Sequence, residues 1–213
     1  MASALTLATV AGILFVWGYT PQPVSAPLPG VQVSAAKSQR PTGPDRIIIP
    51  AAGGVVSPDT MDASMLFIPS LGVYAPVSGV RAAGGVVEPP FPVSTVGWVT
   101  TTSKPGSGQG SILITGHVSD GNVHGALYPL STAVAGARAY LTDAAGSKTA
   151  WQLSTLSTYV KADLPADVWS TVGDERLVVV TCGGAPVVVR GADGVRRFSY
   201  EDNVVAVFVR LQD

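Results

Sequence analysis

The one cysteine of the chain, Cys182, ends an apolar run, RLVVVTC at 176–182, and is followed by Gly183 and Gly184. A lone cysteine is more often a small buried apolar residue than a nucleophile. At the end of a strand, however, a side chain can reach a groove, and the two glycines leave the approach to this thiol open. A cysteine acts as a nucleophile in its thiolate form, which requires a base or a cation beside it.

The chain contains two histidines, His117 and His124. His117 ends a second apolar run, ILITGH at 112–117, as Cys182 ends its own. His124 follows in a polar loop, where a solvated histidine is the simpler interpretation. Two reactive groups at the ends of two buried strands can converge on one edge of a sheet structure. The pattern therefore predicts a pair made of Cys182 and His117.

A thiolate that attacks a carbonyl group generates an oxyanion, which needs hydrogen-bond donors. Three arginines lie between Cys182 and the last expected strand, namely Arg190, Arg196 and Arg197, and we place all three in the loop before that strand. Surface arginines are common, so at most one of the three is expected to act in catalysis.

Short β-branched segments separated by Gly, Pro and Asp provide the elements that position these residues. Gly and Pro are abundant, at 24 and 17 residues, and only 13% of residues are charged, which excludes a coiled coil. The spacing, without long amphipathic helices, predicts a mostly β barrel or sandwich. A helical turn is expected within 125–135. We expect strands at 46–50, 65–77, 111–118, 137–142, 149–160, 176–182 and 203–210.

The N-terminal part differs in composition from the rest. Residues 2–19 carry no charge and are almost long enough to cross a bilayer as a helix, with Trp17 and Tyr19 at the end of the run. A cleaved signal peptide is the alternative to a membrane anchor, and either one implies export. We therefore predict an anchor or signal segment at 1–20, a Pro-rich linker at 21–45 and a catalytic domain at 46–213.

Composition also limits the partners and cofactors of the chain. The formal net charge is −1, so no basic field is available to bind nucleic acid. A single cysteine excludes an intramolecular disulfide framework and a multi-cysteine zinc site. No dense carboxylate cluster indicates calcium, and no cofactor is predicted.

Taken together, the anchor, the Pro-rich linker and the order of the motifs resemble the sortases, which are cysteine transpeptidases of Gram-positive bacterial surfaces. The resemblance extends over essentially all of 46–213 and is strongest to the actinobacterial group called class F. The motifs that carry it are IIIP, LFIPSLGVYAPV, GWV, KPG-SGQGSILITGHV, ALYPL, RLVVVTCGG and Y-EDN-VVAVFV.

This resemblance implies a closed eight-stranded β-barrel with short helices, preceded by a transmembrane helix. It implies that Cys182 is the nucleophile, His117 the general acid and base, and Arg197 the oxyanion-binding cation, with Thr181 shaping the oxyanion site. The implied substrates are LPxTG-type sorting signals of surface proteins, cleaved between Thr and Gly through a thioester. The implied acceptor is a peptidoglycan precursor or another amine, and the implied location is the cell membrane, single-pass, with the catalytic domain outside.

The chain departs from the sortase pattern after the cysteine. The loop at 185–199 (APVVVRGADGVRRFS) is longer than expected, and Glu201, rather than a basic residue, precedes Asp202. Arg197 is our first choice, with Arg190 and Arg196 as rivals. Two other functions stay open, a thiol peptidase that only hydrolyses and a catalytically silent, membrane-tethered binding module.

Overall fold

A computed structural model describes residues 47–49, 54–83, 86–190, 194 and 196–212, apart from a few side chains within these ranges. The chain divides into two units, Met1–Gly30 and Val31–Asp213, and the described residues all belong to the second. The predicted anchor, 1–20, and the whole of the predicted linker, 21–45, thus lie outside the described residues. Within the described part, no helix is both long and apolar enough to span a bilayer.

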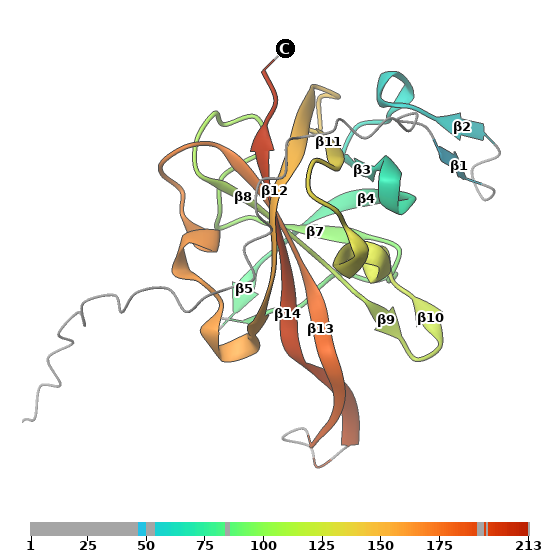
Figure 1. Ribbon diagram of the computed structural model, residues 1–213, viewed down its shortest axis with the longest axis vertical. Coiled ribbons are helices and arrows are strands. Elements are labelled where there is room, and N and C mark those ends of the chain that lie inside the picture. The colour runs from blue at the N-terminus through green and yellow to red at the C-terminus, as the bar shows by residue number, and fades with distance from the viewer. Residues whose placement is uncertain (1–46, 50–53, 84–85, 191–193, 195, 213) are drawn as a thin grey trace, which may run out of the picture. The chain divides into compact units, whose positions relative to one another are not determined.

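Eight strands close into a barrel in the order β11-β12-β14-β13-β8-β7-β4-β3, which confirms the expected closed barrel (Figure 1). The pairs β8–β13 and β4–β7 are parallel, and the other neighbours are antiparallel. The barrel strands are β3 (Met65–Ile68), β4 (Val73–Val80), β7 (Val96–Val99), β8 (Ser111–Gly116), β11 (Arg138–Thr142), β12 (Lys148–Val160), β13 (Arg176–Arg190) and β14 (Arg196–Arg210).

Short elements surround the barrel. Three two-stranded hairpins join β1 (Ile47–Ile49) to β2 (Gly54–Val56), β5 (Ala82–Ala83) to β6 (Val86–Val87), and β9 (Ser119–Asp120) to β10 (Val123–His124). The described helices are 3₁₀ turns, η2 (Pro58–Thr60), η3 (Pro69–Leu71), η4 (Tyr128–Thr132), η5 (Lys161–Asp163) and η6 (Ala166–Trp169). The helical turn expected within 125–135 corresponds to η4.

Alternating residues of the barrel strands enter two different apolar clusters, as the two-residue period of a strand requires. On β13, Leu177 and Val179 pack into a cluster to which all eight barrel strands contribute, and this cluster fills the interior. Val178 and Val180 pack on the opposite face, under Val168 of η6. Cys182 shares the alternation of Val178 and Val180, so its position belongs to the outer face.

Four expected strands differ from the structure. The segment 65–77 forms two strands, β3 and β4, because η3 and Gly72, at φ +66°, turn the chain between them. β7 was not expected from the sequence, since VGWV is short and contains a glycine. The strand expected at 46–50 corresponds to β1, which pairs only with β2 and stays outside the barrel. The strands expected at 176–182 and 203–210 are longer than predicted and form one hairpin, β13–β14.

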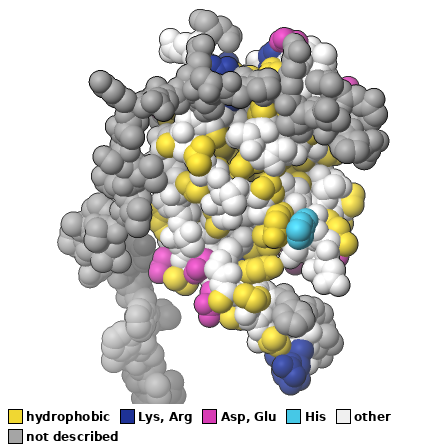
Figure 2. All heavy atoms as spheres, turned by 45° about the vertical axis from the view of Figure 1, so that its right-hand side comes forward, with side chains coloured by type: hydrophobic (Ala, Val, Ile, Leu, Met, Phe, Trp, Pro, Cys, Tyr) yellow, Lys and Arg dark blue, Asp and Glu magenta, His cyan; other side chains and the backbone are white. Residues whose placement is uncertain are grey.

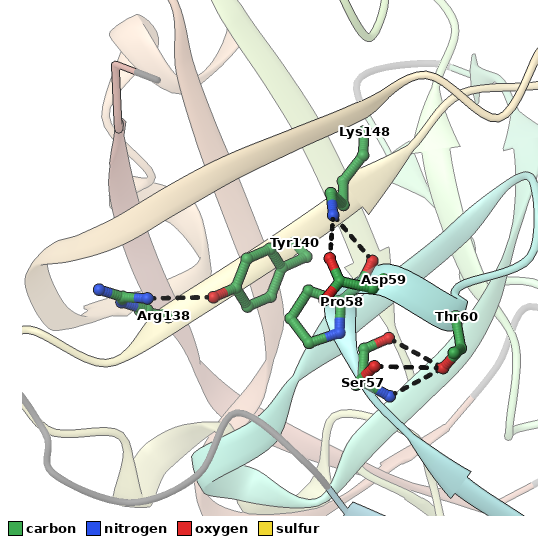
Figure 3. Close-up of polar contacts among 7 residues, drawn as sticks. All are labelled: Ser57, Pro58, Asp59, Thr60, Arg138, Tyr140 and Lys148. Carbon is green, nitrogen blue, oxygen red and sulfur yellow. Dashed lines mark hydrogen bonds and ion pairs between the residues drawn. The ribbon is translucent and has the colours of Figure 1, made fainter.

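Lys148 of β12 forms hydrogen bonds to the segment that precedes the barrel (Figure 3). Lys148 Nζ donates to the Pro58 carbonyl oxygen at 3.0 Å and to Asp59 Oδ1 at 3.2 Å. The turn itself is closed by Ser57 and Thr60, because the Ser57 backbone N–H donates to Thr60 Oγ1 at 3.0 Å. An exposed ion pair of this kind contributes less than about 1 kcal/mol, so this contact orients the segment more than it stabilises the barrel.

Candidate active site

The parallel register of β8 and β13 brings together the strand ends that carry His117 and Cys182. The last register pair is Thr181 with Gly116, and the two reactive residues follow one position later on each strand. Neighbouring strands lie about 4.8 Å apart, so His117 and Cys182 leave the barrel side by side.

An apolar cavity of about 240 Å³ lies on the outer face, where Cys182 is half-buried. Its floor includes Leu113, Thr115 and Val180, which share the strand alternation of His117 and Cys182. A small cavity that is mostly apolar with a few polar groups is typical of a substrate site. The full lining is Val86, Val87, Pro89, Val99, Leu113, Thr115, Gly116, Lys161, Leu164, Trp169, Val180, Thr181, Cys182 and Asn203.

His117 is half-buried and is held by two contacts, although it does not itself line this cavity. Its Nε2 lies 3.2 Å from the carbonyl oxygen of Pro89, which is a lining residue. Because a carbonyl oxygen can only accept a hydrogen bond, Nε2 carries the proton in this contact. The second ring nitrogen, Nδ1, takes no part in it. The imidazole also packs on the Phe91 ring, with the ring centroids 4.6 Å apart.

Thr181 ties the two reactive strands together. The residue is buried, with 3% of its surface exposed, and its hydroxyl donates to the Gly116 carbonyl oxygen at 2.8 Å. This bond joins the residues that immediately precede Cys182 and His117. In the structure, the Thr181 hydroxyl therefore positions the strand ends, and Thr181 also lines the cavity.

A β-bulge follows Cys182 and accounts for the two glycines. Gly183 pairs with Asp202 and Pro186 with Tyr200, so β13 carries one extra residue at this point. Gly184 has φ +77°, and a Cβ there would overlap the Asp202 carboxylate. Bulges of this kind re-aim side chains and are frequent beside active sites.

The sequence predicted that the three candidate arginines lie in a loop. In the structure they lie on the two strands of the β13–β14 hairpin. Arg190 pairs with Arg196, and Arg197 pairs with Val189. The Arg190 guanidinium donates to the Gly194 carbonyl oxygen at 2.7 Å, at the tip. Figure 1 shows this hairpin leaving the barrel, and in Figure 2 Lys and Arg side chains gather where it ends.

The register separates these arginines from the thiol. Cys182 pairs with Asn203, and Arg197 lies six residues earlier on β14. At about 3.3 Å per residue, the two strand positions are about 20 Å apart. The structure does not bring the backbone of Arg197 next to Cys182, and the Arg197 side chain lies outside the described residues.

His124 belongs to a different depression. It is exposed, and its ring stacks on Tyr128, with centroids 3.6 Å apart and planes 6° from parallel. It lines an open depression of about 310 Å³ with Tyr74 and Gly125 and does not line the cavity of Cys182. Across the described residues, no group of three or more His, Cys, Asp or Glu side chains is arranged to hold a metal ion.

Gly125 supports the backbone of His117, which leads to a prediction on stability. A Cβ added at Gly125 would lie 2.6 Å from the carbonyl carbon and 3.0 Å from the Cβ of His117. We expect Gly125→Ala to lower the free energy of unfolding by about 1–3 kcal/mol, because two of the three crowded atoms, the carbonyl oxygen and carbon of His117, belong to the backbone and cannot rotate away. Thermal unfolding should show a Tm decrease of about 2–12 °C.

Gly79→Ala is the matched control for this substitution. Its added Cβ would meet a single side-chain methyl group, Thr100 Cγ2, at 3.1 Å. A methyl group can move by a few tenths of an ångström, so the Tm should change little. Equal Tm decreases in the two variants would contradict the prediction.

No protein-family model and no curated protein sequence matches this chain. Solved structures do match. Sortase C1 of Streptococcus agalactiae aligns with TM-score 0.52 and 17% identity over 70% of this chain and 66% of that chain. The chain has the sortase fold. Sortase C1 of Streptococcus suis aligns with TM-score 0.53 and 15% identity, covering 71% of this chain and 73% of that chain.

Sortase A of Corynebacterium diphtheriae gives TM-score 0.51 and 15% identity, covering 70% of this chain and 60% of that chain. The chain thus spans about two thirds of the length of several sortase structures that it matches. These neighbours belong to classes C and A, and the class F subtype expected from the motifs is not confirmed.

Three polar residues of the cavity were not predicted from the sequence, Thr115, Lys161 and Asn203. Asn203 stands in the Y-EDN motif used for the resemblance, but nothing local distinguishes it from a strand-end asparagine. Lys161 follows β12 in η5, and its ammonium donates to Ser199 Oγ at 3.1 Å. Only the pairing of β12, β14 and β13 places Lys161 and Asn203 near the thiol.

Proposed function

We propose that this chain is a sortase-type cysteine transpeptidase that cleaves the Thr–Gly bond of LPxTG-type sorting signals and transfers the acyl group to an amine. The observation that supports the proposal is the parallel register of β8 and β13, whose last pair is Thr181 with Gly116, so that Cys182 and His117 follow at equivalent positions of neighbouring strands. Cys182 lines the cavity, and His117 contacts Pro89, which also lines it. Thiol and imidazole at neighbouring strand ends have the arrangement of a nucleophile and its general acid.

In the proposed reaction, the Cys182 thiolate attacks the carbonyl carbon of the substrate threonine. A sulfur–carbon bond forms, and the carbonyl π electrons move to oxygen. Collapse of this intermediate breaks the carbon–nitrogen bond to glycine, and the imidazolium of His117 protonates the leaving amine. An incoming amine then attacks the thioester, His117 takes its proton, and the thiolate leaves.

The same proposal includes partners and location. The acyl donors are surface proteins that carry a sorting signal, and the acceptor is a peptidoglycan precursor or another amine. The uncharged segment 2–19 anchors the chain in the cell membrane, and the linker 21–45 holds the barrel outside the cell. No cofactor takes part.

The test uses the full chain in detergent, an LPxTG peptide and an oligoglycine amine, with products identified by mass spectrometry. We expect a peptide ligated to oligoglycine and, after acid quenching, an acyl adduct on the tryptic peptide of Cys182. Cleavage that yields only the free acid with every amine tested would identify a hydrolytic thiol peptidase. The absence of both cleavage and adduct, with LPxTG and LAxTG peptides, would support the silent binding module.

A further inference from the structure

Asn203 occupies the position across from the thiol. In the antiparallel pair β13–β14, Cys182 and Asn203 stand directly opposite each other. Side chains of opposed residues emerge on the same face, with Cβ atoms about 4.5–5.5 Å apart. Both residues line the cavity. The amide group of Asn203, which begins one bond beyond its Cβ, thus reaches the space around Cys182 Sγ.

Of the other polar side chains that line the cavity, Thr115 pairs with Val180, two residues before Cys182, and the remaining two, Thr181 and Lys161, are engaged within the protein. The Thr181 hydroxyl donates to Gly116, and the Lys161 ammonium donates to Ser199. On the far side of the bulge, Ser119 Oγ and Tyr200 OH lie 2.9 Å apart and bond each other. In the described part of the chain, the half-buried Asn203 side chain has no hydrogen-bond partner. Its amide keeps two donors available to a ligand.

A thioester-forming reaction needs such a donor in this place. As Cys182 attacks, negative charge develops on an oxygen attached to the carbon that bonds Sγ, so the oxygen stays within about 3 Å of sulfur. A fixed donor at that point stabilises the transition state more than the ground state. Arg197 lies about 20 Å farther along β14, and position 201 holds an exposed glutamate.

We propose that Asn203 donates a hydrogen bond from Nδ2 to the oxyanion formed when Cys182 attacks, and that it is the oxyanion-binding residue of this site. The inference rests on the proposed function. Asn203 gives no proton away in the reaction: the oxyanion forms, accepts the hydrogen bond, and returns to a carbonyl as the carbon–nitrogen bond breaks.

The test measures kcat and KM of the full chain for the LPxTG peptide in Asn203→Ala, and in Asn203→Asp, which keeps the side-chain shape but loses the donor. Removal of one oxyanion donor typically lowers kcat about 10²–10³-fold. We expect that loss in both variants, with KM changed less than about threefold, since the interaction forms only in the transition state. Asn122→Ala, at an exposed loop asparagine, is the matched control and should keep the wild-type kcat.

Alkylation of Cys182 by iodoacetamide separates this role from a structural one. That displacement at saturated carbon generates no oxyanion, so Asn203→Ala should be alkylated within about twofold of the wild-type rate. A kcat within threefold of wild type in Asn203→Ala overturns the inference, as does an equal loss of kcat and of alkylation rate. If the wild-type chain does not turn over the peptide, the proposed function itself is wrong. The wild-type reaction is measured before any variant, so this outcome is distinguished from a failure of the inference about Asn203.

Discussion

Replacing Cys182 by alanine is expected to lower the rate of peptide cleavage by about 10⁴-fold or more, to the uncatalysed background. Among the described residues that line the cavity, Cys182 carries the strongest nucleophile once its thiol is ionised, so it is the group expected to form the covalent acyl intermediate. Cys182→Ser should lose almost as much, because a hydroxyl is a far weaker nucleophile than a thiolate. Cleavage rates and acyl adducts are measured by mass spectrometry with the LPxTG peptide.

The same substitution should leave the barrel folded. Cys182 is half-buried at a strand end, outside the interior cluster, so Cys182→Ala changes the free energy of unfolding by less than about 1 kcal/mol. Thermal unfolding followed by circular dichroism provides this check. A folded Cys182→Ala variant that cleaves within tenfold of wild type would contradict the assignment of the nucleophile.

The second large effect is expected at His117, where His117→Gln should lower kcat/KM by about 10²–10⁴-fold. Glutamine can replace the donor to the Pro89 carbonyl oxygen but cannot accept and return a proton during the reaction. The loss should not add to that of Cys182→Ala, since the two residues act as one unit. Initial rates of the single variants and of the double variant give the comparison.

His124→Gln is the matched control for this experiment. His124 is exposed, stacks on Tyr128 and lines a separate depression, whereas His117 follows β8 beside the strand that carries Cys182, so replacement of His124 should keep the wild-type rate. A loss at His124 equal to that at His117 would contradict the assignment of His117.

Local sequence patterns were sufficient for part of the site. Cys182 and His117 each end an apolar run, and a run of β-branched residues specifies a buried strand whatever its neighbour is. The closed barrel, by contrast, was expected only through the resemblance to sortases. Motifs that include LITGHV and VVVTCGG carried that resemblance, and the comparison with solved structures supports the sortase fold but not the class F subtype.

The long hairpin was missed because its sequence has the composition of a loop. Gly183, Gly184 and Pro186 interrupt a strand pattern, and GADG at 191–194 is a turn signal. A bulge absorbs the two glycines, and the pairing with β14 then continues to Arg190. The segment expected to be a loop is therefore a hairpin. Its strand positions for Arg190, Arg196 and Arg197 lie far from Cys182 along the two strands.

The sequence by itself determined most of the strand-forming segments and the two strand ends that carry Cys182 and His117, because these depend on residue type and on short periodic patterns. The tertiary structure decided which strand ends meet. β8 and β13 are about 60 residues apart in the chain, and the register between distant strands is set by the packing of whole sheet faces. That packing alone places His117 next to Cys182 and Asn203 opposite it.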